Sequence, residues 1–176
     1  MHRYAIRLAR PDDVALLARI ERAAAALFKP YGFARQFARE TLPREDLASA
    51  VARDFLWVAV DGRDRPVGFA LLEELDGNAH LHEIDVHPKH GRRGLGRALL
   101  ATVIKAARER GYPAITLTTF RHVPWNAPFY ASMGFRVLGE RELPDALRAL
   151  LRAEVERGLP AKERVAMRLR LTPLRS

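Results

Sequence analysis

The chain has 176 residues, of which 48% are hydrophobic, so it is long and apolar enough for a globular domain with its own core. Its 30 basic against 21 acidic residues give a formal net charge of +9, but the arginines are scattered and form no polybasic block of the kind found in nucleic-acid-binding tails. The absence of cysteine excludes disulfides, thiolate metal sites and a cysteine nucleophile.

Seven segments have the alternation or the β-branched composition of strands. The turn signals Asp61-Gly62 and Asp76-Gly77 separate three of them into an antiparallel meander. The first strand of this meander is apolar on both faces, as expected for a strand that is buried on both sides. The expected strands are 4–8, 55–60, 66–72, 79–87, 114–119, 135–138 and 165–171.

Helical spacing of apolar residues fills most intervals between these strands. Residues 29–45 instead predict an irregular or partly helical connection, whose aromatic residues, among them Phe33 and Phe37, either line a substrate pocket or pack in the core. The helix expected over 94–110 joins two strands, and a crossover of this length predicts that those strands are parallel. The expected helices are 11–28, 43–53, 94–110, 125–133 and 143–156.

The turn between the strand 79–87 and the helix 94–110 is rich in glycine and arginine. The first turn of a helix carries unpaired N–H groups and partial positive charge, and glycines let an anion approach them closely. Arginine side chains add charge in a geometry that suits phosphate. The segment matches neither a P-loop nor a complete dinucleotide-binding fingerprint. The candidate phosphate-binding residues are Gly91, Arg92, Arg93, Gly94, Leu95, Gly96, Arg97 and Ala98.

This turn resembles the acetyl-CoA pyrophosphate loop of the GNAT superfamily of N-acetyltransferases, whose motif is [R/Q]-x-x-G-x-[G/A]. Gly94 and Gly96 match the two small positions of the motif. Gly91 departs from it, because the family usually has arginine or glutamine there. Arg92 and Arg93 lie beside that position and could supply the charge.

A second segment, from Asn126 to Phe135, resembles the family signature N-x-x-F-Y-x-x-x-G-F. The order of the expected elements also resembles the GNAT fold, from Ile6 to Leu171. The resemblance implies one N-acetyltransferase domain over residues 1–176, of the α/β (α+β) class. Its expected architecture is a single mixed, mostly antiparallel, twisted sheet of about seven strands, with helices on both faces and a central strand–loop–helix site for CoA.

GNAT enzymes usually transfer an acetyl group directly from acetyl-CoA to a primary amine, which must be neutral, while the leaving thiolate needs a proton donor. The resemblance implies that Tyr130 is this donor. Glu83, on the strand before the loop, is the candidate that prepares the amine, and Asp85 shares its face. The resemblance also implies a cofactor-binding set beyond the loop: the backbone of Ile84, Asp85 and Val86, together with Asn126, Phe129 and Tyr130.

Each of these residues also has an alternative interpretation in which it is only structural. Tyr130 could be a core aromatic residue, Asn126 a helix N-cap, and Glu83 the ion-pair partner of an arginine. The alternative function is a non-catalytic GNAT-fold module that binds CoA as a sensor or interaction domain. The histidines between 80 and 90 lack the carboxylate set of a metal site, so no metal is expected.

The expected partners are acetyl-CoA, as acyl donor, and a small-molecule or peptide amine. The N-terminal residues lack the apolar core of a secretory leader, and no run of 18 uninterrupted apolar residues occurs. We therefore expect a cytoplasmic monomer or homodimer that binds neither membrane nor nucleic acid.

Overall fold

The computed structural model describes residues 4–32 and 41–172, which belong to two compact units. The first unit comprises the residues up to Glu73 together with residues 83–105, and the second comprises residues 74–82 and those from Ala106 onward. Phe33 and Phe37, the aromatic residues expected in the irregular connection, lie outside the described residues.

Among the described residues, seven strands form one mixed sheet, in which hydrogen-bonded neighbours follow the order β1-β2-β3-β4-β5-β7-β6. The β1–β2, β2–β3, β5–β7 and β6–β7 pairs are antiparallel, whereas β4 and β5 are parallel. This confirms the parallel pair predicted on either side of the long helix. The strands are β1 Ala5–Leu8, β2 Leu56–Val60, β3 Pro66–Leu75, β4 Asn78–Val86, β5 Ala114–Phe120, β6 Arg136–Val137 and β7 Arg164–Arg170.

Helices and short 3₁₀ turns connect these strands. The α-helices are α1 Val14–Ala25, α3 Arg44–Ala52, α4 Leu95–Glu109, α5 Ala127–Ala131 and α6 Asp145–Glu156. The 3₁₀ turns are η1 Pro11–Asp13, η2 Ala26–Tyr31, η3 Pro88–His90, η4 Glu140–Glu142 and η5 Ala161–Glu163.

Three of the expected helices are clearly shorter than their patterns suggested. The α-helix expected over 11–28 is α1 alone, with the 3₁₀ turns η1 and η2 at its two ends. The helix α6 begins at Asp145 rather than Leu143, because Pro144 has an extended backbone with ψ 154° and disfavours helix at the residue before it. The helix expected over 125–133 is reduced to α5, and the chain leaves it through Gly134, whose φ is +94°.

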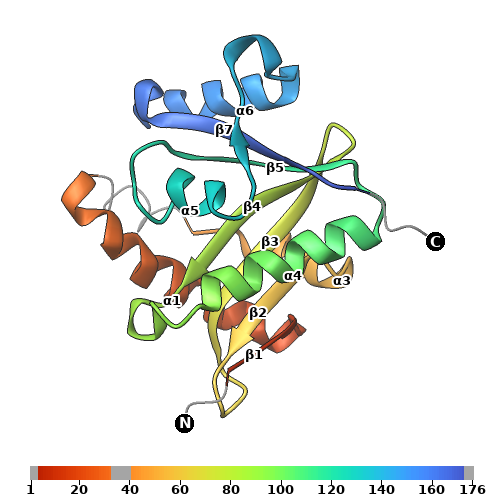
Figure 1. Ribbon diagram of the computed structural model, residues 1–176. Helices are drawn as coiled ribbons and strands as arrows, with labels where there is room; N and C mark the ends of the chain where they lie inside the picture. The colour runs from red at the N-terminus through yellow and green to blue at the C-terminus, as the bar shows by residue number, and fades with distance from the viewer. Residues whose placement is uncertain (1–3, 33–40, 173–176) are drawn as a thin grey trace. The chain divides into compact units, whose positions relative to one another are not determined.

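The core of the first unit surrounds β2, whose five residues are all buried, as predicted for a strand that is apolar on both faces. Figure 1 shows β2 and β3 side by side, with α4 crossing in front of the strands. Leu99 and Val103 on α4 and Leu17 on α1 are fully buried. The amphipathic stripes read from the sequence therefore locate the core of this unit correctly.

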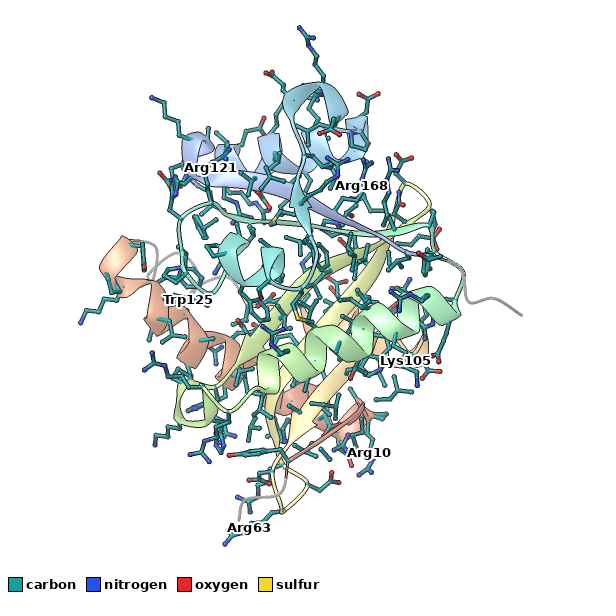
Figure 2. All side chains as sticks on the ribbon, viewed as in Figure 1. Arg10, Arg63, Lys105, Arg121, Trp125 and Arg168 are labelled. Atoms are coloured by element: carbon teal, nitrogen blue, oxygen red, sulfur yellow. The ribbon has the colours of Figure 1, made fainter. Side chains whose placement is uncertain are left out.

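The first strand of this unit is fastened by charged side chains. Arg7 on β1 donates to Asp13 at 2.7 Å and to Asp64 at 2.9 Å, and Arg10 donates to Asp64 at 2.7 Å. Figure 2 shows Arg10 and Arg63 at the same end of the unit, where the β2–β3 turn lies. These bonds hold β1 to the start of α1 and to this turn.

The second unit packs α6 along β7, as Figure 1 shows, and Leu147 of α6 is buried against Leu138 and Ala166. Glu154 of α6 forms a two-pronged ion pair with Arg164 of β7, with N–O distances of 2.9 and 3.0 Å. Both side chains are more than nine-tenths buried. Along the described part of the chain, no helix is long and apolar enough to cross a membrane.

Candidate functional site

Strand β4 continues well beyond its parallel pairing with β5. The registered pairs are Ala79 with Ile115 and His80 with Thr116, whereas β4 runs on to Val86. Residues 79–81 are buried, but all four residues from 83 to 86 are partly exposed. The backbone predicted to bind pantetheine, that of Ile84, Asp85 and Val86, therefore lies in an accessible stretch of strand.

Strand β3 approaches this stretch very closely at Gly68. A Cβ atom at Gly68 would lie 2.8 Å from the backbone oxygen of Asp85 and 3.1 Å from Cγ2 of Val86. The N–H of His87 donates to the carbonyl of Val67 at 2.8 Å and fastens the end of β4 to β3. The absence of a side chain at Gly68 thus sets the position of the β4 backbone in the candidate site.

We expect Gly68→Ala to displace the Asp85 backbone, because a Cβ atom at 2.8 Å from a main-chain oxygen cannot be accommodated without a shift. The overpacking should lower the free energy of unfolding by about 2 kcal/mol, measured by urea denaturation. The matched control is Gly139→Ala, since Gly139 has φ −69° and its nearest atom would be 3.5 Å from the new Cβ. Equal effects of the two substitutions would contradict this account of Gly68.

Two carboxyl groups, Glu83 and Asp85, share one face of β4 and hydrogen-bond to each other. Burial raises the pKa of Glu83 well above its usual range, and the charges of Asp85 and of Glu21, on α1, raise it further. Burial also raises the pKa of Asp85, to about 6, although the hydrogen bond from Glu83 lowers it in part. Both side chains keep some access to the surface, yet the surrounding protein removes much of their hydration.

The raised pKa values decide between two interpretations of Glu83. An arginine partner would lower the pKa of this carboxyl group, so the ion-pair interpretation is disfavoured. The two carboxyl groups hydrogen-bond to each other, and both of their pKa values are raised. Such a pair can accept a proton at a higher pH than an ordinary exposed carboxylate can.

The chain passes from β4 to α4 through a turn with two left-handed residues. Arg92 has φ +58° and Gly94 has φ +78°, and the N–H of Ala98 donates to the carbonyl of Gly94 at 2.9 Å. Gly94 is therefore the cap of α4, and the N–H groups of Leu95 and Gly96 precede the first intrahelical hydrogen bond. The space around Gly94 is open, since an added Cβ would have no atom within 4 Å.

The three arginines of this segment are not equivalent. Arg92 and Arg97 are exposed beside the helix start. Arg93 is directed to another part of the first unit, where its Nη1 donates to the phenol oxygen of Tyr4 at 2.9 Å. Arg92 and Arg97 thus lie exposed beside the helix start, where the sequence predicts an anion site, while Arg93 contacts an aromatic side chain.

The second signature segment forms α5 and its flanks in the second unit. Asn126 is the N-cap residue of α5, as the structural interpretation expected, and its carbonyl accepts from Tyr130 N at 3.0 Å, although its side chain makes no capping hydrogen bond. Its Oδ1 accepts from the hydroxyl of Thr119 at 2.6 Å. Tyr130 is 8% exposed and its ring lies 5.3 Å from that of Phe129 and 5.8 Å from that of Phe135. The aromatic packing inferred for Tyr130 is therefore present, whether or not it also takes part in chemistry.

Three contributors to this geometry were not among the sequence candidates: Tyr4, Glu21 and Gly68. A glycine inside a strand pattern indicates close backbone approach, so Gly68 carried a readable signal. The sequence around Tyr4 and Glu21 gives no such signal, because the contacts of these residues join positions far apart in the chain. In the ranges 4–32 and 41–172, no three histidine or acidic side chains gather in a way that could hold a metal ion.

A mixed open sheet in which a strand leads through a glycine-containing turn into a long helix places the chain in the α/β class. The model of the acetyltransferase (GNAT) family matches residues 17–135, more than half of the chain. The chain belongs to this family.

Among curated proteins, the chain is similar to peptidyl-lysine N-acetyltransferase YjaB of Escherichia coli, with 33% identity over 90 residues, which are 51% of this chain and 55% of the relative. It thus spans about half the length of that relative. It is also similar to the uncharacterized N-acetyltransferase YjcF of Bacillus subtilis, with 28% identity over 107 residues, which are 61% of this chain and 74% of the relative.

Among solved structures, the PaiA N-acetyltransferase of Thermoplasma acidophilum in complex with coenzyme A has a TM-score of 0.70 and 17% identity, over 96% of this chain and 99% of its own. The ribosomal-protein-S18-alanine N-acetyltransferase of Escherichia coli has a TM-score of 0.68 and 19% identity, over 98% and 96% of the two chains. These likenesses show that the fold is the GNAT fold.

Proposed function

We propose that the chain is an acetyl-CoA-dependent N-acetyltransferase that moves an acetyl group directly to a primary amine. The observation that carries this proposal is the continuous run from Glu83 to Ala98. In this run, an accessible strand end bearing a carboxyl pair leads into an exposed helix start with two arginines. The family and the names of the curated relatives support the same reaction.

The proposed binding of acetyl-CoA uses two parts of this run. The helix start at Gly94, Leu95 and Gly96 offers backbone N–H groups and partial positive charge for the pyrophosphate, and Arg92 and Arg97 add full charges. The backbone from Ile84 to Val86 supplies hydrogen-bonding groups for the pantetheine amides, in the manner of an added strand.

The proposed chemistry assigns one proton movement to each of two groups. The amine nitrogen attacks the acetyl carbonyl carbon, a C–N bond forms, and the C–S bond breaks with its electron pair on sulfur. Tyr130 donates its phenolic proton to the sulfur and regains a proton from solvent. The carboxyl pair of Glu83 and Asp85 accepts the proton that the amine loses, directly or through water. The acceptor is a small-molecule or peptide amine, in line with the peptidyl-lysine specificity that the name of YjaB states.

Gly96→Glu tests the cofactor site. A carboxylate in the first turn of α4 should repel the pyrophosphate and block close approach to the helix start, so CoA should bind about 100-fold more weakly than to the unsubstituted chain. The helix itself tolerates this change, because negative charge near a helix N-terminus is favourable. The dissociation constant for CoA, measured by calorimetry, reports the effect.

The matched control is Ala101→Glu, which adds the same charge at an exposed position of the same helix, beyond its first turn. It should bind CoA nearly as well as the unsubstituted chain. If the folded, unsubstituted chain bound no CoA, the assignment of acetyl-CoA as acyl donor would be overturned. Equal losses in both variants would show that net charge, and not the helix start, governs binding.

A further inference from the structure

The phenol of Tyr4 contacts the loop before α4 at two points. Its oxygen accepts a hydrogen bond from Arg93 Nη1 at 2.9 Å and lies 3.0 Å from His90 Nδ1. The guanidinium of Arg93 also lies over the tyrosine ring, 5.8 Å from its centre, and the ring of His90 meets it edge-on at the same separation. One side chain, 86 positions before His90 in the chain, therefore joins both ends of the segment His90–Arg93.

This segment needs an external restraint. Arg92 lies inside it with φ +58°, a left-handed conformation that a residue with a Cβ atom rarely adopts unless its surroundings impose it. The turn η3 before it is held by short-range bonds, from His90 N to His87 O at 2.8 Å and from Lys89 N to His87 Nδ1 at 3.2 Å. The bonds from Tyr4 to His90 and Arg93 restrain the chain on both sides of Arg92, as far as the residue before Gly94.

The strand that follows Tyr4 is held in place by sheet pairing and by charged side chains. Tyr4 immediately precedes β1, whose first residue, Ala5, is registered with Val60. Arg7 of the same strand is fastened to Asp13 and Asp64. The hydroxyl group of Tyr4 takes no part in these bonds, so its contacts with the loop are separable from the folding of β1.

We propose that Tyr4 is a positioning residue, which holds the loop in the shape that presents the start of α4 to the pyrophosphate of CoA. In this arrangement, Arg93 supports the shape of the loop, and the charge toward the phosphates comes from Arg92 and Arg97. The proposal rests on the proposed function, since it concerns the same cofactor site, but it assigns that site a support that the loop motif does not contain.

Tyr4→Phe tests the proposal, because it removes the hydroxyl group and keeps the ring over which Arg93 lies. The loss of hydrogen bonds to a cation and an imidazole should weaken CoA binding about tenfold. The KM for acetyl-CoA should rise by a similar factor, while turnover at saturating acetyl-CoA is retained. Arg93→Gln should weaken CoA binding similarly, and the double variant should be no worse than either single one.

The matched control is Tyr112→Phe, which removes a hydroxyl group that donates to Glu74 at 2.9 Å in the second unit. This variant should bind CoA normally. An unchanged CoA affinity in Tyr4→Phe would overturn the proposal. So would a tighter one, which would mean that Tyr4 withholds Arg93 from the phosphates.

Hydrogen exchange of the ligand-free chain separates this proposal from the proposed function. Tyr4→Phe should speed exchange at the amides of residues 91–96, while Tyr112→Phe should leave them unchanged. If the unsubstituted chain failed to bind CoA and exchange still rose, the restraint by Tyr4 would stand and its role toward CoA would be rejected. Unchanged exchange in a chain that does bind CoA would reject the restraint alone.

Discussion

Tyr130→Phe is expected to lower turnover about 100-fold or more, because a general acid of this kind contributes at least two orders of magnitude to rate. Phenylalanine keeps the ring between Phe129 and Phe135, so the local packing should persist. It removes the hydroxyl group, whose proton we propose is donated to the departing thiolate. CoA affinity should therefore change little, and the loss should appear in kcat.

The measurement is release of CoA thiol from acetyl-CoA in the presence of a saturating amine, alongside calorimetry with CoA. Tyr112→Phe again serves as the control, since it removes a tyrosine hydroxyl that we assign no role. Full turnover in Tyr130→Phe would show that this side chain only packs. CoA binding by an unsubstituted chain without turnover on any amine would instead support a non-catalytic CoA-binding module.

Local pattern was sufficient to predict the elements around the site. The strand expected over 79–87 is observed at 78–86, and the helix expected over 94–110 is observed at 95–109. Alternation, helical spacing and the capping glycine each depend on neighbouring residues, which the sequence displays directly. The left-handed conformation of Gly94, with φ +78°, is a finding of the structure, although a glycine suits such a position because it lacks a Cβ atom.

Contacts between distant positions could not be predicted in this way. Arg93 lies in the turn whose sequence resembles a pyrophosphate loop, and nothing near it in sequence indicates that it bonds to Tyr4. Glu154 and Arg164 have the composition of solvated surface, yet they form a buried ion pair, because α6 packs along β7. In both cases packing, rather than composition, determines what the charged group does.

Replacing Glu83 by glutamine is expected to lower turnover and, above the ordinary carboxyl pKa, to stabilise the fold. Burial, with the charges of Asp85 and Glu21, raises the pKa of Glu83 in the folded chain well above the value of 4.5 that it has when unfolded. The folded state therefore binds more protons than the unfolded state between these two values. The stability due to this group is fully present below pH 4.5 and is lost as pH rises through the folded pKa.

Glutamine resembles protonated Glu83 but cannot ionise, so the variant should keep the stability that the unsubstituted chain loses. The gain should grow with pH by at most about 1.4 kcal/mol per pH unit. Urea unfolding at about pH 5 and about pH 8 measures it. The control is Glu142→Gln, because Arg136 lowers the pKa of Glu142 to about 2 and its contribution has the opposite sign. That variant should gain no stability at the higher pH.

The same variant separates two chemical roles of the carboxyl pair. If the pair accepts the amine proton, Glu83→Gln should lower kcat and alter the rise of kcat/KM that we expect for the unsubstituted chain near pH 6, the value to which burial raises the pKa of Asp85. If the pair only attracts a cationic amine, the KM for the amine should rise and kcat should persist. Asp85→Asn should move the rise away from pH 6, since it removes the group whose pKa is about 6 and leaves Glu83 as the titrating carboxyl group. Retained kcat in both variants would exclude the pair as the proton acceptor, whatever its effect on stability, because a base that takes the proton in the transition state cannot be removed without lowering the rate.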